Sequence, residues 1–293
     1  MTVGVRAWVW QLAMAATLLA ICPLSRAQEQ LPPATKANLL PPLIPAEKHP
    51  WARFPVGSWT LVRITKESFD ARGVATASIE EVKRTLKATA PGSYTLLIER
   101  TVEAGGRRLQ FQPQEQSFGL SGEKASETVE DVQTLGESEV TLNGRKILCE
   151  VRQAVMTEGT NRTTVKVFYS PEVTPHALRR ERVAATSPEA APTTTTEEVI
   201  SVGMPYLVID EIRASAFVHT LQKDPAQTTE SMEVICSEVP GGIVSQSSKV
   251  LHPDGKLKHR TTQELTGYHV QQPPRPTAVS PGRPRIKRGA PRR

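Results

Sequence analysis

The sequence lacks the commonest motifs for catalysis and cofactor binding. It has no Gly-x-Ser-x-Gly elbow, no Cys-x-x-Cys pair, no His-Glu-x-x-His and no phosphate-cradling glycine loop. Aromatic residues make up only 5% of the 293 residues and hydrophobic residues 38%, which is little apolar material for a compact enzyme of this length. We therefore expect a non-enzymatic protein with no cofactor and no metal site.

Long apolar runs are also missing, except at the start of the chain. Residues 7–21 are almost entirely apolar, follow a single basic residue and end before a proline. Small residues, Ser25 and Ala27, then occupy the positions that a signal peptidase reads, so the pattern predicts a secretory signal cleaved between Ala27 and Gln28. Because a membrane span needs about 20 consecutive apolar residues, we expect a secreted or periplasmic chain with no transmembrane segment after cleavage.

Acidic residues are absent from the last part of the chain. Residues 271–293 hold seven basic residues, and they contain six prolines, as do residues 28–50. Both segments are predicted to be disordered, one as a Pro-rich arm and the other as a basic tail.

The positive net charge of +6 therefore does not belong to the folded region. Nine of the 36 basic residues lie in the signal or the tail, which leaves 27 basic against 30 acidic residues in positions 28–270. This near-neutral balance argues against a domain that binds nucleic acid specifically. The tail itself predicts weak binding to anionic envelope polymers or lipids.

Cysteine is scarce. Cys22 lies in the predicted signal, so only Cys149 and Cys236 remain in the mature chain. An oxidising compartment allows these two to form a disulfide. Two buried free thiols are the alternative. Each cysteine lies on the apolar side of an alternating segment, which fits both interpretations.

What the sequence does contain is a recurring alternation of apolar and polar residues from Trp51 to Tyr268. Such alternation predicts strands with one buried face, and Asn143-Gly144 is typical of a two-residue hairpin turn. The pattern indicates an all-β or mostly β fold, a partly open barrel or sandwich of about a dozen antiparallel strands. Residues 206–221 fit a helix or a strand, and their β-branched content favours a strand.

One internal segment interrupts the alternation. Residues 187–196 read Ser-Pro-Glu-Ala-Ala-Pro followed by four threonines, a composition typical of an exposed connector. We expect it to separate two β-rich parts, residues 51–186 and 197–270, that pack against each other.

Two predicted hairpins, residues 165–183 and 232–250, share a pattern of strand, Ser-Glu-Val turn with proline, and strand. Aligning Glu172 with Glu238 requires one gap. This unit resembles hairpins of uncharacterised exported bacterial proteins and is similar to domains of unknown function related to outer-membrane lipoprotein carriers. The resemblance implies a strongly curved antiparallel sheet with a concave apolar face. The second hairpin departs from it at Cys236, where an aromatic residue is expected.

Candidate site residues are scattered along the sequence. Ser170, Glu172 and His176 would have to come together to form a hydrolase site. Three residues around one turn, His252, Asp254 and His259, could bind a metal. Ser121 to Lys124 match the Ser-x-x-Lys motif of serine acyl-transferring enzymes, without its companion motifs. The metal candidate is better explained by a lone core histidine, and the second match by chance.

An aromatic group follows the Pro-rich arm, comprising Trp51, Phe54 and Trp59. It predicts either an exposed platform for a ligand or, in keeping with the burial of large aromatics, a plug at one end of the sheet.

Together these features favour an exported, non-enzymatic β module that binds an apolar or envelope ligand. The alternatives are a hydrolase whose site is assembled from distant residues and a structural or adhesive envelope protein.

Overall fold

The computed structural model describes residues 42–70, 72–124, 126–187 and 190–272. The predicted signal, its cleavage site between Ala27 and Gln28, the first part of the Pro-rich arm and nearly all of the basic tail lie outside these ranges. Among the residues described, no helix has the length and apolar character needed to cross a membrane.

The described ranges contain one short 3-10 helix, η1 (Ala46–Lys48), and fourteen strands. The strands are β1 (Trp59–Phe69), β2 (Ala75–Ala90), β3 (Ser93–Ala104), β4 (Arg107–Gln110), β5 (Gln114–Gly119), β6 (Thr128–Leu142), β7 (Arg145–Glu158), β8 (Asn161–Tyr169), β9 (Ala177–Ala185), β10 (Thr193–Val208), β11 (Glu211–Asp224), β12 (Gln227–Ile235), β13 (Ile243–Leu251) and β14 (Leu257–His269).

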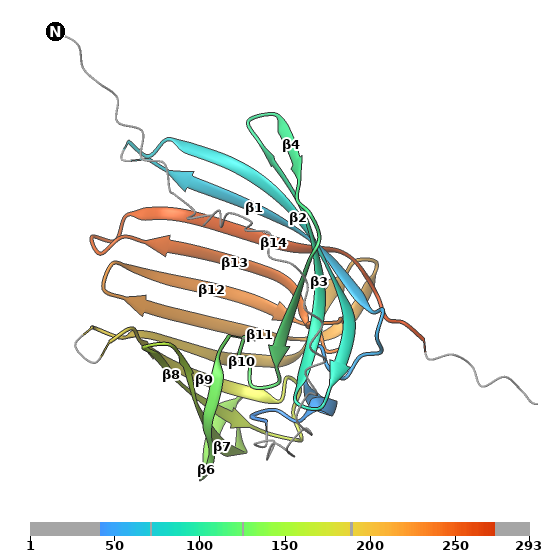
Figure 1. The fold of residues 1–293 in the computed structure, drawn as a ribbon, viewed down its shortest axis with the longest axis vertical. Helices are drawn as coiled ribbons and strands as arrows, with labels where there is room; N and C mark the ends of the chain where they lie inside the picture. The colour runs from blue at the N-terminus through green and yellow to red at the C-terminus, as the bar shows by residue number, and fades with distance from the viewer. Residues whose placement is uncertain (1–41, 71, 125, 188–189, 273–293) are drawn as a thin grey trace, which may run out of the picture. The chain divides into compact units, whose positions relative to one another are not determined.

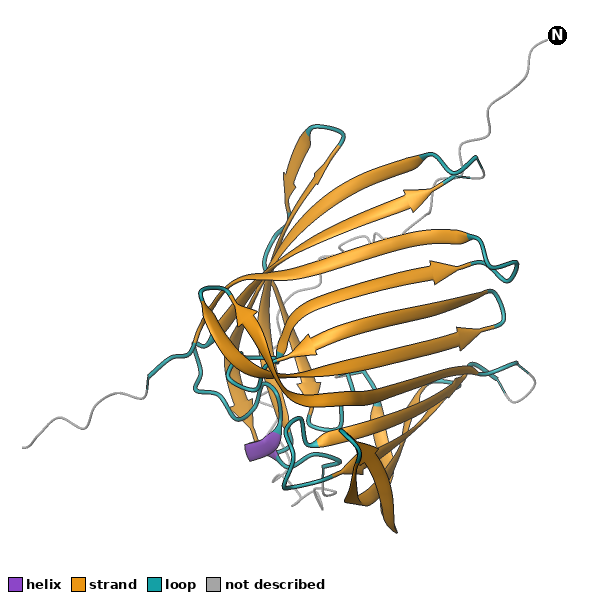
Figure 2. Cartoon of the chain, turned by 180° about the vertical axis from the view of Figure 1, so that it is seen from behind, coloured by secondary structure: helices purple, strands orange, loops and turns teal. Residues whose placement is uncertain are grey.

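All of these strands join one antiparallel sheet (Figure 1). Its order is β4-β3-β2-β1-β14-β13-β12-β11-β10-β9-β8-β7-β6, and β5 pairs with β3. Apart from β1–β14 and β3–β5, neighbouring strands follow one another along the chain and form hairpins. The strands bend strongly along their length (Figure 2). The prediction of a mostly β, curved antiparallel sheet is confirmed, in the form of a single sheet that does not close.

The alternation in the sequence produces the predicted faces. In β8 the side chains of Thr163, Val165, Val167 and Tyr169 are buried, and the residues between them are partly exposed. The hairpin turn at Asn143-Gly144 is also present between β6 and β7, with φ angles of 49° and 74°. Positive φ at both positions is what a two-residue turn of this kind requires.

Residues 206–221 form strands, as favoured, but they belong to two of them. Strand β10 ends at Val208 and β11 begins at Glu211, so Ile209 and Asp210 form a tight turn. Ile209 has a φ of 57°, a left-handed conformation that a β-branched residue rarely adopts. This is why the sequence gives no sign of the turn.

The threonine-rich segment 187–196 does not separate two parts of the molecule. Strand β10 begins within it, at Thr193, and pairs with β9 from the Thr193–Ala184 position onward. The sheet is therefore continuous across this segment. The four threonines, predicted to belong to the connector, are β-branched and therefore well suited to a strand.

The end of the Pro-rich arm is packed against the sheet from residue 42 onward. Leu43 and Ile44 are only 1% and 5% exposed and join a cluster with Ala154, Met156 and Val167. Prolines fix an extended backbone, but they do not prevent the apolar residues between them from being buried. Three further clusters of buried apolar residues lie along the sheet.

Candidate functional site

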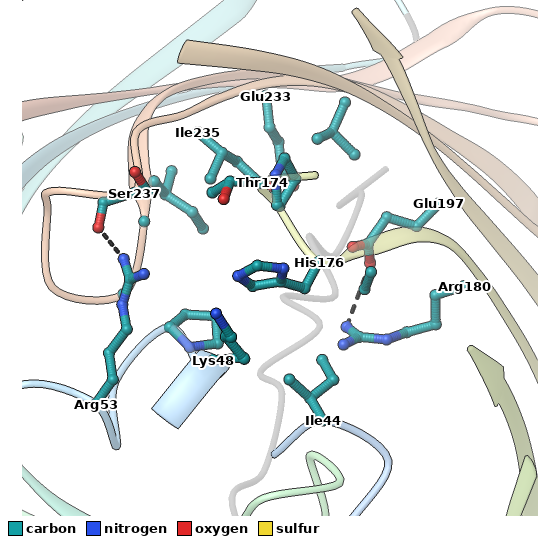
Figure 3. Close-up of a pocket in the computed structure, with 17 residues that line it drawn as sticks. Ile44, Lys48, Arg53, Thr174, His176, Arg180, Glu197, Glu233, Ile235 and Ser237 are labelled. Carbon is teal, nitrogen blue, oxygen red and sulfur yellow. Dashed lines mark hydrogen bonds and ion pairs between the residues drawn. The ribbon is translucent and has the colours of Figure 1, made fainter. Parts of the chain in front are cut away.

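A cavity of about 350 Å³ lies between the N-terminal segment, residues 44–53, and the sheet (Figure 3). Strands β9 to β12 contribute to its wall, together with the loops that join β8 to β9 and β12 to β13. Its charged or titratable lining residues are Lys48, Arg53, His176, Arg180, Glu197 and Glu233. Its apolar lining includes Ile44, Val218, Ile235 and Ile243.

The two loops at the cavity are built alike. In the first, the Ser170 amide donates a hydrogen bond to the His176 carbonyl at 2.8 Å, and in the second the Cys236 amide donates to the Gly242 carbonyl at the same distance. The two loops therefore have equal length and are closed by the same bond. They correspond to the two similar hairpins in the sequence, and Glu172 matches Glu238 with no gap inside the loop.

The N-terminal segment is fixed to these loops by polar contacts. The Gly241 amide donates to the Pro50 carbonyl at 2.9 Å, and the Arg53 guanidinium donates to the Ser237 carbonyl. On the other side, the Ser121 hydroxyl accepts a hydrogen bond from the Leu43 amide at 3.1 Å. The segment thus covers one side of the cavity.

His49 stabilises the backbone of the N-terminal segment through hydrogen bonds. Its Nδ1 accepts hydrogen bonds from the Trp51 and Ala52 amides, both at 3.2 Å, so this nitrogen carries no proton. Burial, followed by the positive charges of Arg180 and Arg53, lowers the pKa of His49 from 6.5 to about 4. The residue is therefore a neutral acceptor at physiological pH.

His176 lies in the middle of the lining residues (Figure 3). Its Nδ1 is 3.0 Å from the Ser170 carbonyl oxygen, and because a carbonyl only accepts, Nδ1 is the protonated nitrogen. Burial lowers the pKa of His176, against the opposing effect of that hydrogen bond, and the charges of Lys48 and Arg53 lower it further. Its Nε2 is therefore left as an acceptor.

Two carboxylates occupy the wall formed by the strands. Arg180 lies 3.5 Å from Glu197, across the β9–β10 pair. Glu233 accepts a hydrogen bond from the Gln246 side-chain amide at 2.7 Å. Burial, together with the charge of Glu197, raises the pKa of Glu233.

The hydrolase candidates are not arranged for nucleophilic catalysis. Ser170 and His176 are close, but His176 binds the carbonyl of Ser170. Within the described part of the chain, the buried Ser170 hydroxyl has no hydrogen-bond partner. Glu172 is exposed and lines a separate hollow, so it does not orient the imidazole as a catalytic carboxylate would.

The other candidates lie apart. His259 Nδ1 is 3.0 Å from the Ser68 hydroxyl, and Asp254 forms an ion pair with Lys256 at 3.0 Å. In the described ranges no three His, Cys, Asp or Glu side chains are grouped so as to hold a metal ion. Ser121 and Lys124 lie in a turn and a bridge outside the strands.

Both cysteines are buried free thiols in the structure. Cys149 belongs to a cluster with Leu178 and Val218, and Cys236 to a different cluster with Val239. The disulfide between them stays a prediction.

The aromatic group divides between two places. Trp51 and Phe54 pack with Leu86, Tyr94 and other apolar residues at the N-terminal segment. Trp59 lies on β1, with the Lys83 ammonium 5.3 Å from its ring centre.

Four charged residues of the cavity were not predicted from the sequence: Arg53, Arg180, Glu197 and Glu233. The last three occupy positions in strands where alternation places them on the inner face together with Val218 and Val199. Charged residues at such inward positions were the available sign of a polar cavity.

Comparisons with known proteins give little further information. No family model and no curated protein matches the chain. Two similar solved structures are a presumed lipoprotein from Parabacteroides distasonis and a presumed exported protein with a YmcC-like fold from Bacteroides fragilis. The first has 9% identity and a TM-score of 0.32 over 73% of this chain and 96% of its own. The second has 8% identity and a TM-score of 0.29 over 74% and 98%. Scores this low do not establish a shared fold.

Proposed function

We propose that this chain is an exported, non-enzymatic β module that binds a small ligand in the cavity beneath the N-terminal segment. One observation carries the proposal: a cavity of about 350 Å³ combines an apolar wall with a few convergent polar groups. Ligand sites typically have this composition and a volume of about 300–1,000 Å³. The arrangement of Ser170, Glu172 and His176 disfavours the hydrolase alternative.

Export is part of this proposal and has its own test. A chain recovered from the periplasm or the medium should have the intact mass expected for a protein that begins at Gln28. A different N-terminus would overturn the cleavage site, and a retained apolar segment would overturn export itself.

Ligand binding is tested with a neutral fluorescent probe, N-phenylnaphthylamine, on the mature chain. Ser237→Trp places a large ring in the cavity wall without removing the carbonyl that Arg53 binds. The matched control is Ser247→Trp, on the exposed side of β13 and outside this cavity. We expect saturable binding that Ser237→Trp abolishes and Ser247→Trp leaves unchanged. Equal binding by all three proteins would show that the cavity is not the site.

A further inference from the structure

Arg53 is a half-buried residue whose guanidinium has no carboxylate partner among the described residues. Within the described ranges none of the salt bridges involves Arg53. Its guanidinium donates to the Ser237 carbonyl and lies 4.8 Å from the Phe54 ring centre. Its Nε is buried without a hydrogen-bond partner among these residues.

Two more cations line the same cavity. Lys48 also takes part in no salt bridge of the described chain, and it lies on the same side of His176 as Arg53 (Figure 3). Arg180 lies on the opposite side next to Glu197, and its Nε is likewise buried without a partner among the described residues.

The lowered pKa values of the two histidines are consistent with a positive potential in the cavity. The charges of Arg180 and Arg53 contribute to the lowered pKa of His49, and those of Lys48 and Arg53 to the lowered pKa of His176. Glu197 is paired with Arg180, and Glu233 accepts a hydrogen bond from the neutral Gln246 amide. Three lining cations therefore face two carboxylates, which leaves the cavity with an excess of positive charge.

Half-buried cations and buried N–H donors beside a cavity destabilise the protein when no anion is bound there. Removing a charge from water is costly unless it is paired, and an unpaired buried donor adds a further penalty. Beside these groups the wall is apolar, formed by Ile44, Ile235 and Ile243. The cavity therefore presents a cationic end next to an apolar surface.

We propose that the ligand is a small amphiphilic anion whose carboxylate or phosphate group binds Arg53 and Lys48 and whose apolar part lies against Ile44, Ile235 and Ile243. This inference rests on the proposed ligand-binding function. The volume suits a short apolar chain.

The test is displacement of N-phenylnaphthylamine from the mature chain by decanoate, decyl phosphate and uncharged decanol. We expect both anions to compete about tenfold to a hundredfold more strongly than decanol, the range that a charged hydrogen bond contributes. Arg53→Gln should remove most of this difference, and Arg53→Lys should keep part of it. Arg63→Gln, at an exposed position on β1, should behave like the unmodified protein.

Arg53 also binds the loop that holds the N-terminal segment, so a substitution of Arg53 could disturb the fold as well as ligand binding. A second variant separates these two effects. Lys48→Ala removes a side chain that has no hydrogen bond or salt bridge in the described chain, and it should weaken decanoate and leave decanol unchanged. If decanol competes as well as decanoate, the inference of an anionic ligand is wrong while the cavity remains a binding site. If inorganic phosphate competes as strongly as decyl phosphate, the apolar part of the inference is wrong. If the probe does not bind the cavity at all, the proposed function itself fails.

Discussion

Gly241 lies so close to the indole of Trp51 that no side chain fits between them. A Cβ atom added at Gly241 would be 2.7 Å from the ring, and the residue has a φ of 80°. The Gly241 amide also donates to the carbonyl of Pro50. This glycine is therefore the point at which the loop between β12 and β13 meets the N-terminal segment over the cavity.

We predict that Gly241→Ala destabilises the protein more than the same change at a comparable glycine. Gly255 has nearly the same φ, 81°, but has open space around it. Gly255→Ala should cost about 1–2 kcal/mol for the left-handed backbone, and Gly241→Ala about 1–3 kcal/mol more for the clash. Urea unfolding of the three proteins measures both values. Equal losses would mean that the contact with Trp51 contributes nothing.

His49 should make stability depend on pH. Its pKa in the folded chain, about 4, lies below the unfolded value near 6.5, so the unfolded chain binds the proton more readily. The stabilisation is fully present above about pH 6.5 and is lost as the pH falls towards 4. For this 7% exposed residue, the loss amounts to about 3 kcal/mol, measured by urea unfolding across this range.

His49→Asn provides the comparison, because an asparagine carbonyl can accept the Trp51 and Ala52 amides without titrating. The variant should be less sensitive to pH than the unmodified protein. His252→Asn, in the exposed turn before β14, should retain the full dependence. Identical pH profiles for the His49 variant and the unmodified protein would contradict this assignment.

The thiols should be unreactive in the folded protein and countable after denaturation. Burial raises the pKa of both Cys149 and Cys236, and the thiolate is the reactive form. Titration of the folded, exported chain should be slow, and denaturation without reductant should expose two thiols per chain. A count of zero would establish the disulfide that the sequence allows.

We propose that the basic tail binds polyanions and that folding does not need it. A truncation should keep Gln271, whose amide donates to the Ser58 hydroxyl at 3.0 Å, and end at Gln272. We expect an unchanged melting temperature and the loss of heparin retention, which in the full chain should fall steeply with salt because binding releases counterions. Retention that survives truncation would locate the binding surface on the folded sheet.

Sequence patterns predicted the sheet wherever local chemistry determines it. Alternation identified the inward residues of β8, and Asn143-Gly144 identified the turn between β6 and β7 because both residues tolerate positive φ. Ile209 breaks that local rule, and its turn was missed. The pairing of β1 with β14 joins distant segments, which no local pattern can reveal.

The site was harder to predict for a related reason. Alternation indicates which side chains point inward, but it does not distinguish a filled core from a cavity. Arg180 and Glu233 therefore appeared as ordinary members of charged strands. Arg53 lies next to the segment assigned to a disordered arm, and its role depends on the packing of Leu43 and Ile44, which prolines on both sides concealed.

The pairing of β1 with β14 also has a consequence for how the chain folds. Ser58 and Gln271, which meet beside this pair, are 213 residues apart in the sequence, and contacts of such long range slow folding. During synthesis β1 and β2 are available long before β14, so β1 presents an unpaired edge until the last strand is complete. Open strand edges invite pairing with other chains. The folding chain is therefore most vulnerable to aggregation before residues 257–269 pair with β1.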